Sequence, residues 1–181
     1  FIDSGVLVAW GDFMSSNGAH EKSAVKEEGY TRKLCQFLTK VEDVCSCEIT
    51  IAADPGYTGQ DYPEEFGGRL TICGKSFELI QDSDFIILHN STAISFAVIL
   101  KKPAIFITTD FHLSLGDDIS IMANTLGKSV TNIDSEYNLD MEDEMKVDEE
   151  LYKKYMKEYI KKEGTPEINS WQIVANRISN I

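Results

Sequence analysis

The sequence lacks any apolar run long enough to cross a membrane as a helix. Its longest such run, Ala93–Leu100, falls far short of the roughly 20 residues that a spanning helix needs. It also lacks an initiator methionine and a signal sequence, since Phe1 already lies in a stretch with the character of a strand. We therefore interpret the chain as the C-terminal part of a larger protein.

Basic residues are scarce: 17 Lys and Arg stand against 30 Asp and Glu, which gives a formal net charge of −13. A nucleic-acid-binding protein needs a basic face to neutralise phosphates, so this balance argues against nucleic acid as a partner. A nucleotide ligand is still allowed, because backbone N–H groups at a helix N-terminus can hold a phosphate whatever the net charge. Much of the acidity lies in residues 134–150, which we interpret as a solvated, mobile connector.

The four cysteines lack the spacing of a zinc site or of a redox motif. No Cys-x-x-Cys occurs, and Cys45-Ser-Cys47 is too tight for a usual zinc pair and has no second pair to face. We expect reduced thiols in a cytoplasmic protein.

Apolar runs and helical patterns alternate along the first 133 residues. Helical spacing predicts helices over 23–44, 76–82, 91–101 and 114–126. The runs around them predict short strands at 1–3, 48–53, 70–72, 84–88, 103–108 and 128–133. Because these strands are apolar throughout, we expect a mostly parallel sheet covered on both faces. Residues 1–133 would then form a three-layer, Rossmann-like α/β domain.

The end of the chain, residues 151–181, predicts helices that pack on the same domain. Their expected limits are 148–162 and 168–181. Three tyrosines of the first helix recur at helical spacing: Tyr152, Tyr155 and Tyr159. Such a stripe could stack on sugars, but the spacing favours packing onto the sheet.

The segment 84–109 is the most informative part of the sequence. It predicts a strand that ends at His89, a polar turn, a helix and a second strand. Asn90 or Ser91 is a good N-cap for this helix. The backbone N–H groups of residues 92–94 would then have no partner inside the helix. They would point outward at the carboxyl edge of the sheet, where open α/β sheets bind ligands and the helix dipole favours an anion.

Polar side chains around this turn could complete an anion site. Ser91, Thr92 and Ser95 bring hydroxyl donors, and His89 could donate to a phosphate when protonated, or to a sugar oxygen. Alternatively, Ser91 is only a cap and His89 only a core histidine. The helix itself is apolar nearly all round, which predicts that it is buried and that its N-terminus is held rigidly.

Two further segments follow predicted strands at the same edge. The loop that begins at Thr109 and Asp110 either reaches a ribose or base, or merely caps the sheet. Ser4 and Gly5 follow the first strand after Asp3, and Gly5 would permit a close approach of the backbone to a ligand. We count Thr109, Ser4 and Gly5 among the candidate binding residues.

The run from His89 to Thr92, with Lys102-Pro103 before the next strand, resembles a pattern found in GT-B glycosyltransferases. In these enzymes a strand leads into a Ser/Thr-rich turn and a helix with small residues, and then into Gly-Lys-Pro or a similar sequence. The pattern is similar to that of bacterial capsule and surface-polysaccharide transferases, including the polysialyltransferase-like group that uses CMP-activated sugars. The resemblance covers most of 49–109 and, loosely, the C-terminal helices.

This resemblance implies that the chain is half of a GT-B fold, the C-terminal half that binds the nucleotide sugar. It implies transfer of a sugar from a CMP- or UDP-linked donor to a glycan acceptor in surface polysaccharide biosynthesis. The enzyme would be cytoplasmic, with at most peripheral association at the inner face of the membrane through an export machinery. The catalytic base would lie in the N-terminal half, which this sequence does not include, so no catalytic residue is assigned here beyond leaving-group support from His89.

The resemblance also implies that no metal or cofactor is needed. Residues 82–84 match the Asp-x-Asp motif that binds a metal in another class of glycosyltransferases. They precede their strand, however, and so should lie at the edge opposite the expected site.

One position departs from the family pattern. The transferases place His-Pro at the end of an earlier strand, whereas this chain has Asp54-Pro55. Pro55 preserves the turn, but an ionised Asp54 would repel a leaving phosphate that a histidine could support. The chain could use another group, bind a different donor or be inactive. Two alternatives therefore stay open: a nucleotide-sugar 2-epimerase-like enzyme, and a non-catalytic, degenerate transferase domain.

Overall fold

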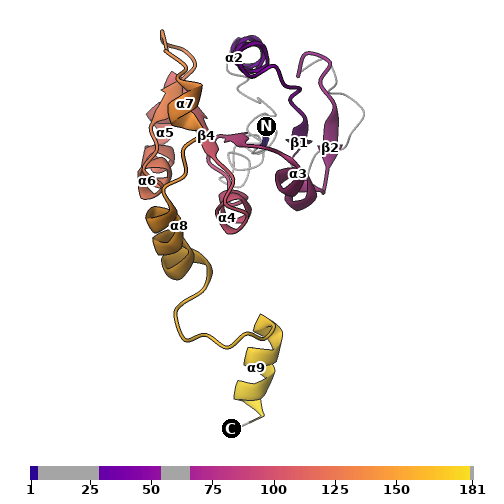
Figure 1. The fold of residues 1–181 in the computed structure, drawn as a ribbon, viewed down its shortest axis with the longest axis vertical. Helices are drawn as coiled ribbons and strands as arrows, with labels where there is room; N and C mark the ends of the chain where they lie inside the picture. Colours follow the sequence, from indigo (N-terminus) through magenta and orange to yellow (C-terminus); the bar gives the residue numbers. More distant parts are fainter. Residues whose placement is uncertain (4–28, 54–65, 180–181) are drawn as a thin grey trace, which may run out of the picture.

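The computed structural model describes residues 1–3, 29–53 and 66–179. Short parallel strands lie between layers of helices, which is a Rossmann-like α/β fold (Figure 1). The strands are β1 Ile51–Ala53, β2 Thr71–Cys73, β3 Ile86–Leu88, β4 Ala104–Thr108 and β5 Val130–Asn132. Each falls where the sequence predicts one, which confirms the expected fold class.

Ile2 joins the two groups of paired strands. β1 pairs with β2, β3 with β4 and β4 with β5, all in parallel. Ile2 forms parallel bridges to both Ala52 and Leu88, and its N–H donates to the carbonyl of Ile87 at 2.8 Å. With Ile2 counted as the first strand, the spatial order is β2, β1, Ile2, β3, β4, β5. This is the order 3-2-1-4-5-6 of doubly wound nucleotide-binding sheets.

The helices differ more from their expected limits than the strands do. They are α2 Tyr30–Cys45, α3 Ser76–Asp82, α4 Ile94–Ile99, α5 Asp110–Leu115, α6 Asp118–Thr125, α7 Met141–Glu144, α8 Glu149–Tyr155, the π-helical turn η1 Met156–Ile160 and α9 Ser170–Ile178. The single helix predicted over 114–126 is wrong. Thr109 caps a helix that begins at Asp110, and Gly116 separates it from α6.

Alternate residues of the strands face two separate cores. In β4, Phe106 packs with α3, α4, α6 and α8, whereas Ile105 and Ile107 pack under α2. The α2 side chains that face the sheet are all buried: Tyr30, Leu34, Phe37, Leu38 and Val41. A sheet covered on both faces explains why its strands read as continuous apolar runs.

The acidic connector is more structured than a solvated loop. Residues 134–150 contain α7, and the partly buried Tyr137 and Leu139 pack against the core beneath α2. The buried Lys128 donates from Nζ to the carbonyls of Asp143 at 2.9 Å and Glu144 at 2.7 Å. The Asp143 carbonyl also accepts the N–H of Lys146 at 3.1 Å, and Lys128 adds a charged donor to both carbonyls at the end of this helix, so one lysine anchors the connector.

Replacing this lysine should therefore loosen the connector. We expect Lys128→Met to lower the free energy of unfolding by about 1–3 kcal/mol, because the apolar chain still fits but the carbonyls lose their donor. Urea denaturation followed by circular dichroism measures the change. Lys146→Met, which removes only an exposed ion pair with Asp143, is the matched control and should change stability by less than about 1 kcal/mol. Equal effects of the two variants would contradict the anchoring role.

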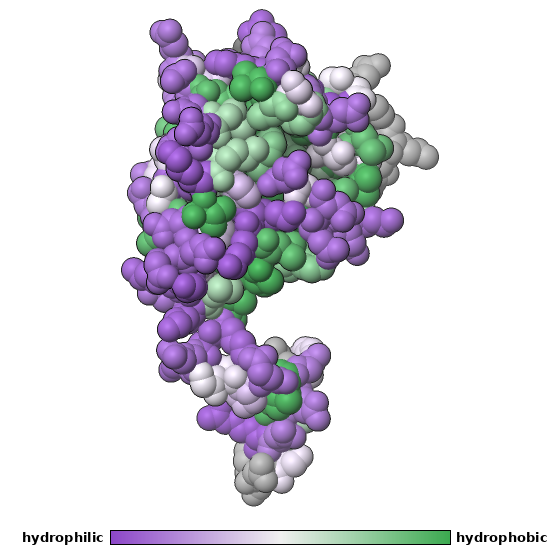
Figure 2. Space-filling model, viewed as in Figure 1, coloured by the Kyte–Doolittle hydropathy of each residue, from purple (hydrophilic) through white to green (hydrophobic). Residues whose placement is uncertain are grey.

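The C-terminal helices divide into a packed part and a projecting part. Tyr152 and Tyr155 are buried on the sheet, as their spacing predicts, while Tyr159 is 61% exposed. Helix α9 does not pack on the domain as expected. It stands away from the layered body (Figures 1 and 2). Its Trp171 is 80% exposed. In the described residues, no helix combines the length and the apolar character that a membrane span requires.

Candidate functional site

The carboxyl edge of the sheet brings together the ends of two strands at the point where the strand order reverses. Asp3 follows Ile2, and its N–H donates to the carbonyl of Ala52 at 2.9 Å. His89 follows β3 on the other side of Ile2, and both Asp3 and His89 are buried. Doubly wound sheets bind ligands in the crevice at such a reversal. The candidate site predicted from the sequence lies at this edge.

His89 lies in an aromatic pocket and is only 3% exposed. Its Nε2 lies 2.6 Å from the hydroxyl of Tyr30, and its ring meets Phe1 edge-on. Burial, with a smaller contribution from His112, lowers the pKa of His89 to about 3. This makes His89 neutral near pH 7, which favours a role other than that of a protonated phosphate donor. Its bond to Tyr30 instead fixes the ring behind the turn that follows β3.

His112 and Thr109 complete a buried polar cluster with His89. The rings of His89 and His112 have centroids 4.9 Å apart, and Thr109 Oγ1 lies 2.8 Å from His112 Nδ1. The same Thr109 oxygen accepts the N–H of His112 at 3.2 Å and so caps α5. Burial lowers the pKa of His112, and Asp134 opposes this shift. In the described part of the chain, His89 Nδ1 and His112 Nε2 are buried without a well-formed hydrogen bond.

Sequence reasoning missed the contributions of Tyr30 and His112 to this cluster. A usable signal for His112 was present, because Thr109 comes directly after a predicted strand and is a good N-cap residue. A helix that starts there puts His112 in its first turn at the carboxyl edge. Tyr30 gave no such signal, because its partner His89 is 59 residues away along the chain.

The loop after β4 is tied to the end of β5. The Asp110 N–H donates to Asp134 at 2.8 Å, and Asn132 donates to the Asp110 carboxylate at 2.7 Å. Burial acts to raise the pKa of Asp134, but hydrogen bonds from Lys33 and from the Asp110 N–H outweigh it and lower the pKa. Of the two alternatives for this loop, the contacts favour capping of the sheet.

The turn from Asn90 to Thr92 begins the helix differently from the expected way. The N-cap of α4 is Ala93, and neither Asn90 nor Ser91 holds that position. The Ala93 N–H bonds to Ser91 Oγ at 3.3 Å, and the Ile94 N–H bonds to the Ser91 carbonyl at 3.2 Å. Two of the three N–H groups expected to be unpaired are therefore satisfied. Within the described residues, the N–H groups of Ser91 and Thr92 are left for a ligand, and Asn90 and Thr92 are exposed.

Helix α4 is buried on one side only. Ile94, Ala97 and Val98 face the core, but Phe96 is 38% and Ile99 47% exposed, so the expected burial all round is wrong. Among the described residues, α3 and η1 make the closest contacts with this helix. The hydroxyl of Ser95, one turn into the helix, lies 3.4 Å from that of Tyr155. The side chain of Ser95 is therefore close to the end of α8.

Four further candidates lie outside the described residues. They are Ser4, Gly5, Asp54 and Pro55. Asp3 and Ala53, which precede these pairs, are both held at the sheet by the pairing around Ile2. The backbone therefore leaves the described part of the sheet at the same edge as His89.

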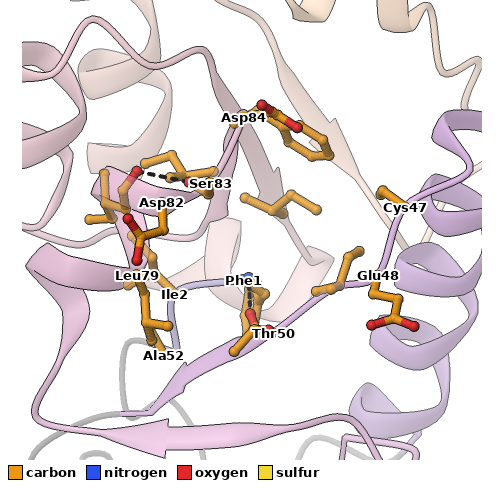
Figure 3. Close-up of a pocket in the computed structure, with 15 residues that line it drawn as sticks. Phe1, Ile2, Cys47, Glu48, Thr50, Ala52, Leu79, Asp82, Ser83 and Asp84 are labelled. Atoms are coloured by element: carbon orange, nitrogen blue, oxygen red, sulfur yellow. Dashed lines mark hydrogen bonds between the residues drawn. The ribbon is translucent and has the colours of Figure 1, made fainter.

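A cavity lies at the opposite, amino edge of the sheet (Figure 3). It has a volume of about 360 Å³ and is lined by Phe1 and by the segments that lead into β1 and β3. Residues 82–84 line it, as their position before β3 predicts. The described residues contain no group of three or more His, Cys, Asp or Glu side chains arranged to hold a metal ion.

No family model, no curated protein and no solved structure matches this chain. The strongest local evidence for its function is the exposed polar turn at the reversal of strand order, backed by the neutral His89–Tyr30 pair.

Proposed function

We propose that this chain is the nucleotide-sugar-binding part of a glycosyltransferase that moves a sugar from a CMP- or UDP-linked donor to a surface glycan. The observation that carries the proposal is the reversal of strand order at Ile2, next to an exposed polar turn at the end of β3. The crevice at such a reversal is the usual ligand site of open α/β sheets. The resemblance of His89–Thr92 to the transferase pattern supports the choice of ligand.

The donor phosphate would lie on the turn from Asn90 to Thr92. The free N–H groups of Ser91 and Thr92 would donate to its oxygens, and the side chains of Asn90 and Thr92 would add two more donors. In this arrangement neutral donors hold the phosphate. His89, itself neutral and bonded to Tyr30, would act as a positioning residue that keeps the turn in place. Such preorganised donors stabilise charge that develops on a leaving nucleotide.

The test is binding of CMP, UDP and GDP to the isolated chain by calorimetry and thermal shift. We expect at least one nucleotide to bind, and the double variant Asn90→Ala, Thr92→Val to bind it about tenfold or more weakly, because two donors are lost. Asn138→Ala removes an equally exposed amide from the connector and should leave affinity unchanged. If no nucleotide binds the wild type, or if the double variant binds as well as the control, the proposal fails.

A further inference from the structure

Helix α9 carries an exposed apolar stripe. Trp171, Val174 and Ile178 follow one another at three- and four-residue steps, which places them on one face of the helix. All three side chains are exposed, and so is that of Ile168 just before the helix. Figure 2 shows α9 as a lobe separate from the body of the molecule, with hydrophobic residues on its surface. Exposed apolar side chains that gather in this way mark a surface that meets a partner.

The helix is short, and its first turn is capped locally. Asn169 Oδ1 accepts the N–H of Trp171 at 2.9 Å. A helix of nine residues is only marginally stable in water by itself, because the few hydrogen bonds it makes do not offset the cost of nucleation. Most helices in proteins are stabilised by packing of an apolar face. A partner that covers the stripe would therefore stabilise α9.

The charge of the chain changes sign near this helix. Residues 151–181 carry six Lys and Arg against three Asp and Glu, whereas residues 1–150 carry 11 against 27. Five of the six basic residues are lysines that lie together in residues 153–162, between the buried Tyr152 and α9. An acidic body repels an anionic partner, so this lysine-rich segment would direct such a partner to α9. Charge complementarity therefore indicates a partner with negative charge.

The ion pairs that these lysines make within the chain are exposed. Lys153 lies 2.6 Å from Glu150, Lys157 lies 3.3 Å from Glu163, and all four side chains are more than half exposed. Exposed pairs contribute little to stability and are screened by salt. A surface with many negative charges can therefore take the place of the glutamates at little cost.

We propose that α9 and the lysine-rich segment 153–162 bind the surface of an anionic lipid bilayer, with the stripe of α9 in the headgroup region and the lysines near the lipid phosphates. Helices that lie in a membrane interface combine an apolar face, often with tryptophan, with a polar face and nearby basic residues. Gln172 and Asn176 supply the polar face of α9. Tryptophan favours this depth because its ring is apolar while its N–H keeps a polar partner. Lysines beside the helix add attraction to anionic headgroups.

A second copy of this chain is a poorer occupant of the stripe. A stable protein interface buries about 800 Å² on each partner, which is more than three side chains of one short helix supply. Two copies with a formal net charge of −13 each also repel one another. A bilayer requires no matching pocket, and α9 projects from the body towards such a flat partner (Figure 1). The acidic body then stays off the lipid, where salt screens charges beyond about 8 Å.

The test is sedimentation of the full chain with vesicles of phosphatidylcholine and phosphatidylglycerol in equal parts, and with vesicles of phosphatidylcholine alone. We expect binding to the anionic vesicles that weakens as salt is added, and little binding to the neutral ones. Trp171→Ala should weaken binding at least about tenfold, because the largest apolar side chain of the stripe is lost. Gln172→Ala, on the other face, is the control and should bind like the wild type. Alanine is the better helix former in both variants, so a loss cannot come from a lower helix propensity.

The lysines are tested by the double variant Lys154→Gln, Lys157→Gln. Its control is Lys75→Gln, Lys146→Gln, which removes the same charge from exposed positions of the body. We expect the first variant to bind anionic vesicles about tenfold or more weakly and the second to bind like the wild type. In a chain with Trp10→Phe, Trp171 is the sole tryptophan, and its emission should shift to shorter wavelength when anionic vesicles are added.

Three results would overturn membrane binding by α9: no sedimentation with anionic vesicles, equal binding by the two lysine double variants, or a Trp171 emission that vesicles leave unchanged. A chain that sediments as a dimer without vesicles, with the emission of Trp171 already shifted, would show that a second copy covers the stripe instead. None of these measurements involves a nucleotide. Failure of this proposal is therefore distinguishable from failure of the proposed function, which concerns the turn after β3.

Discussion

Acidification from pH 6.5 to pH 3 should cost this protein roughly 4 to 5 kcal/mol of folding free energy through His89 alone. In the unfolded chain this imidazole takes up its proton near pH 6.5, but in the fold burial lowers its pKa to about 3. Between these values the unfolded chain binds more protons, so a fall in pH favours unfolding. The stabilising neutral form is fully present above pH 6.5 and is lost as the pH drops towards 3.

The variant His89→Gln isolates this contribution. Glutamine keeps a neutral polar side chain that can still meet the Tyr30 hydroxyl, but it does not titrate. Urea unfolding at several pH values should show a clearly flatter stability profile between pH 6.5 and 3 in the variant than in the wild type. Parallel profiles for the two proteins would show that His89 is hydrated and protonated normally in the fold.

The strands could be predicted from the sequence because burial on both faces leaves a plain signal. Residues 85–88 and 103–107 form continuous apolar runs, and each run overlaps a strand. Helix α3 begins and ends at the predicted residues, Ser76 and Asp82, although Lys75 rather than Ser76 is its N-cap. The order of the strands could not be predicted from the sequence. It depends on the bridges from Ile2 to Ala52 and to Leu88, which lie 50 and 86 positions further along the chain.

The details of the candidate site depended on contacts that local patterns do not encode. The start of α4 is set by a tight turn in which the Ser91 carbonyl takes the Ile94 N–H, so Ser91 is not the cap that its residue type suggests. The exposure of Phe96 depends on how far α3 extends over α4. His89 follows β3, and His112 lies in the helix that follows β4. Because β4 pairs with β3, the two imidazole rings come into contact.

The central claim is that the turn after β3 holds a donor phosphate. The most direct test is a titration of isotope-labelled protein with CMP and UDP, followed by NMR shifts of the backbone amides. The account predicts saturable shifts that are largest at Ser91 and Thr92, with little change at Thr50 and Ile87 on the opposite edge. Shifts that are absent with both nucleotides, or that are centred away from this turn, would contradict it.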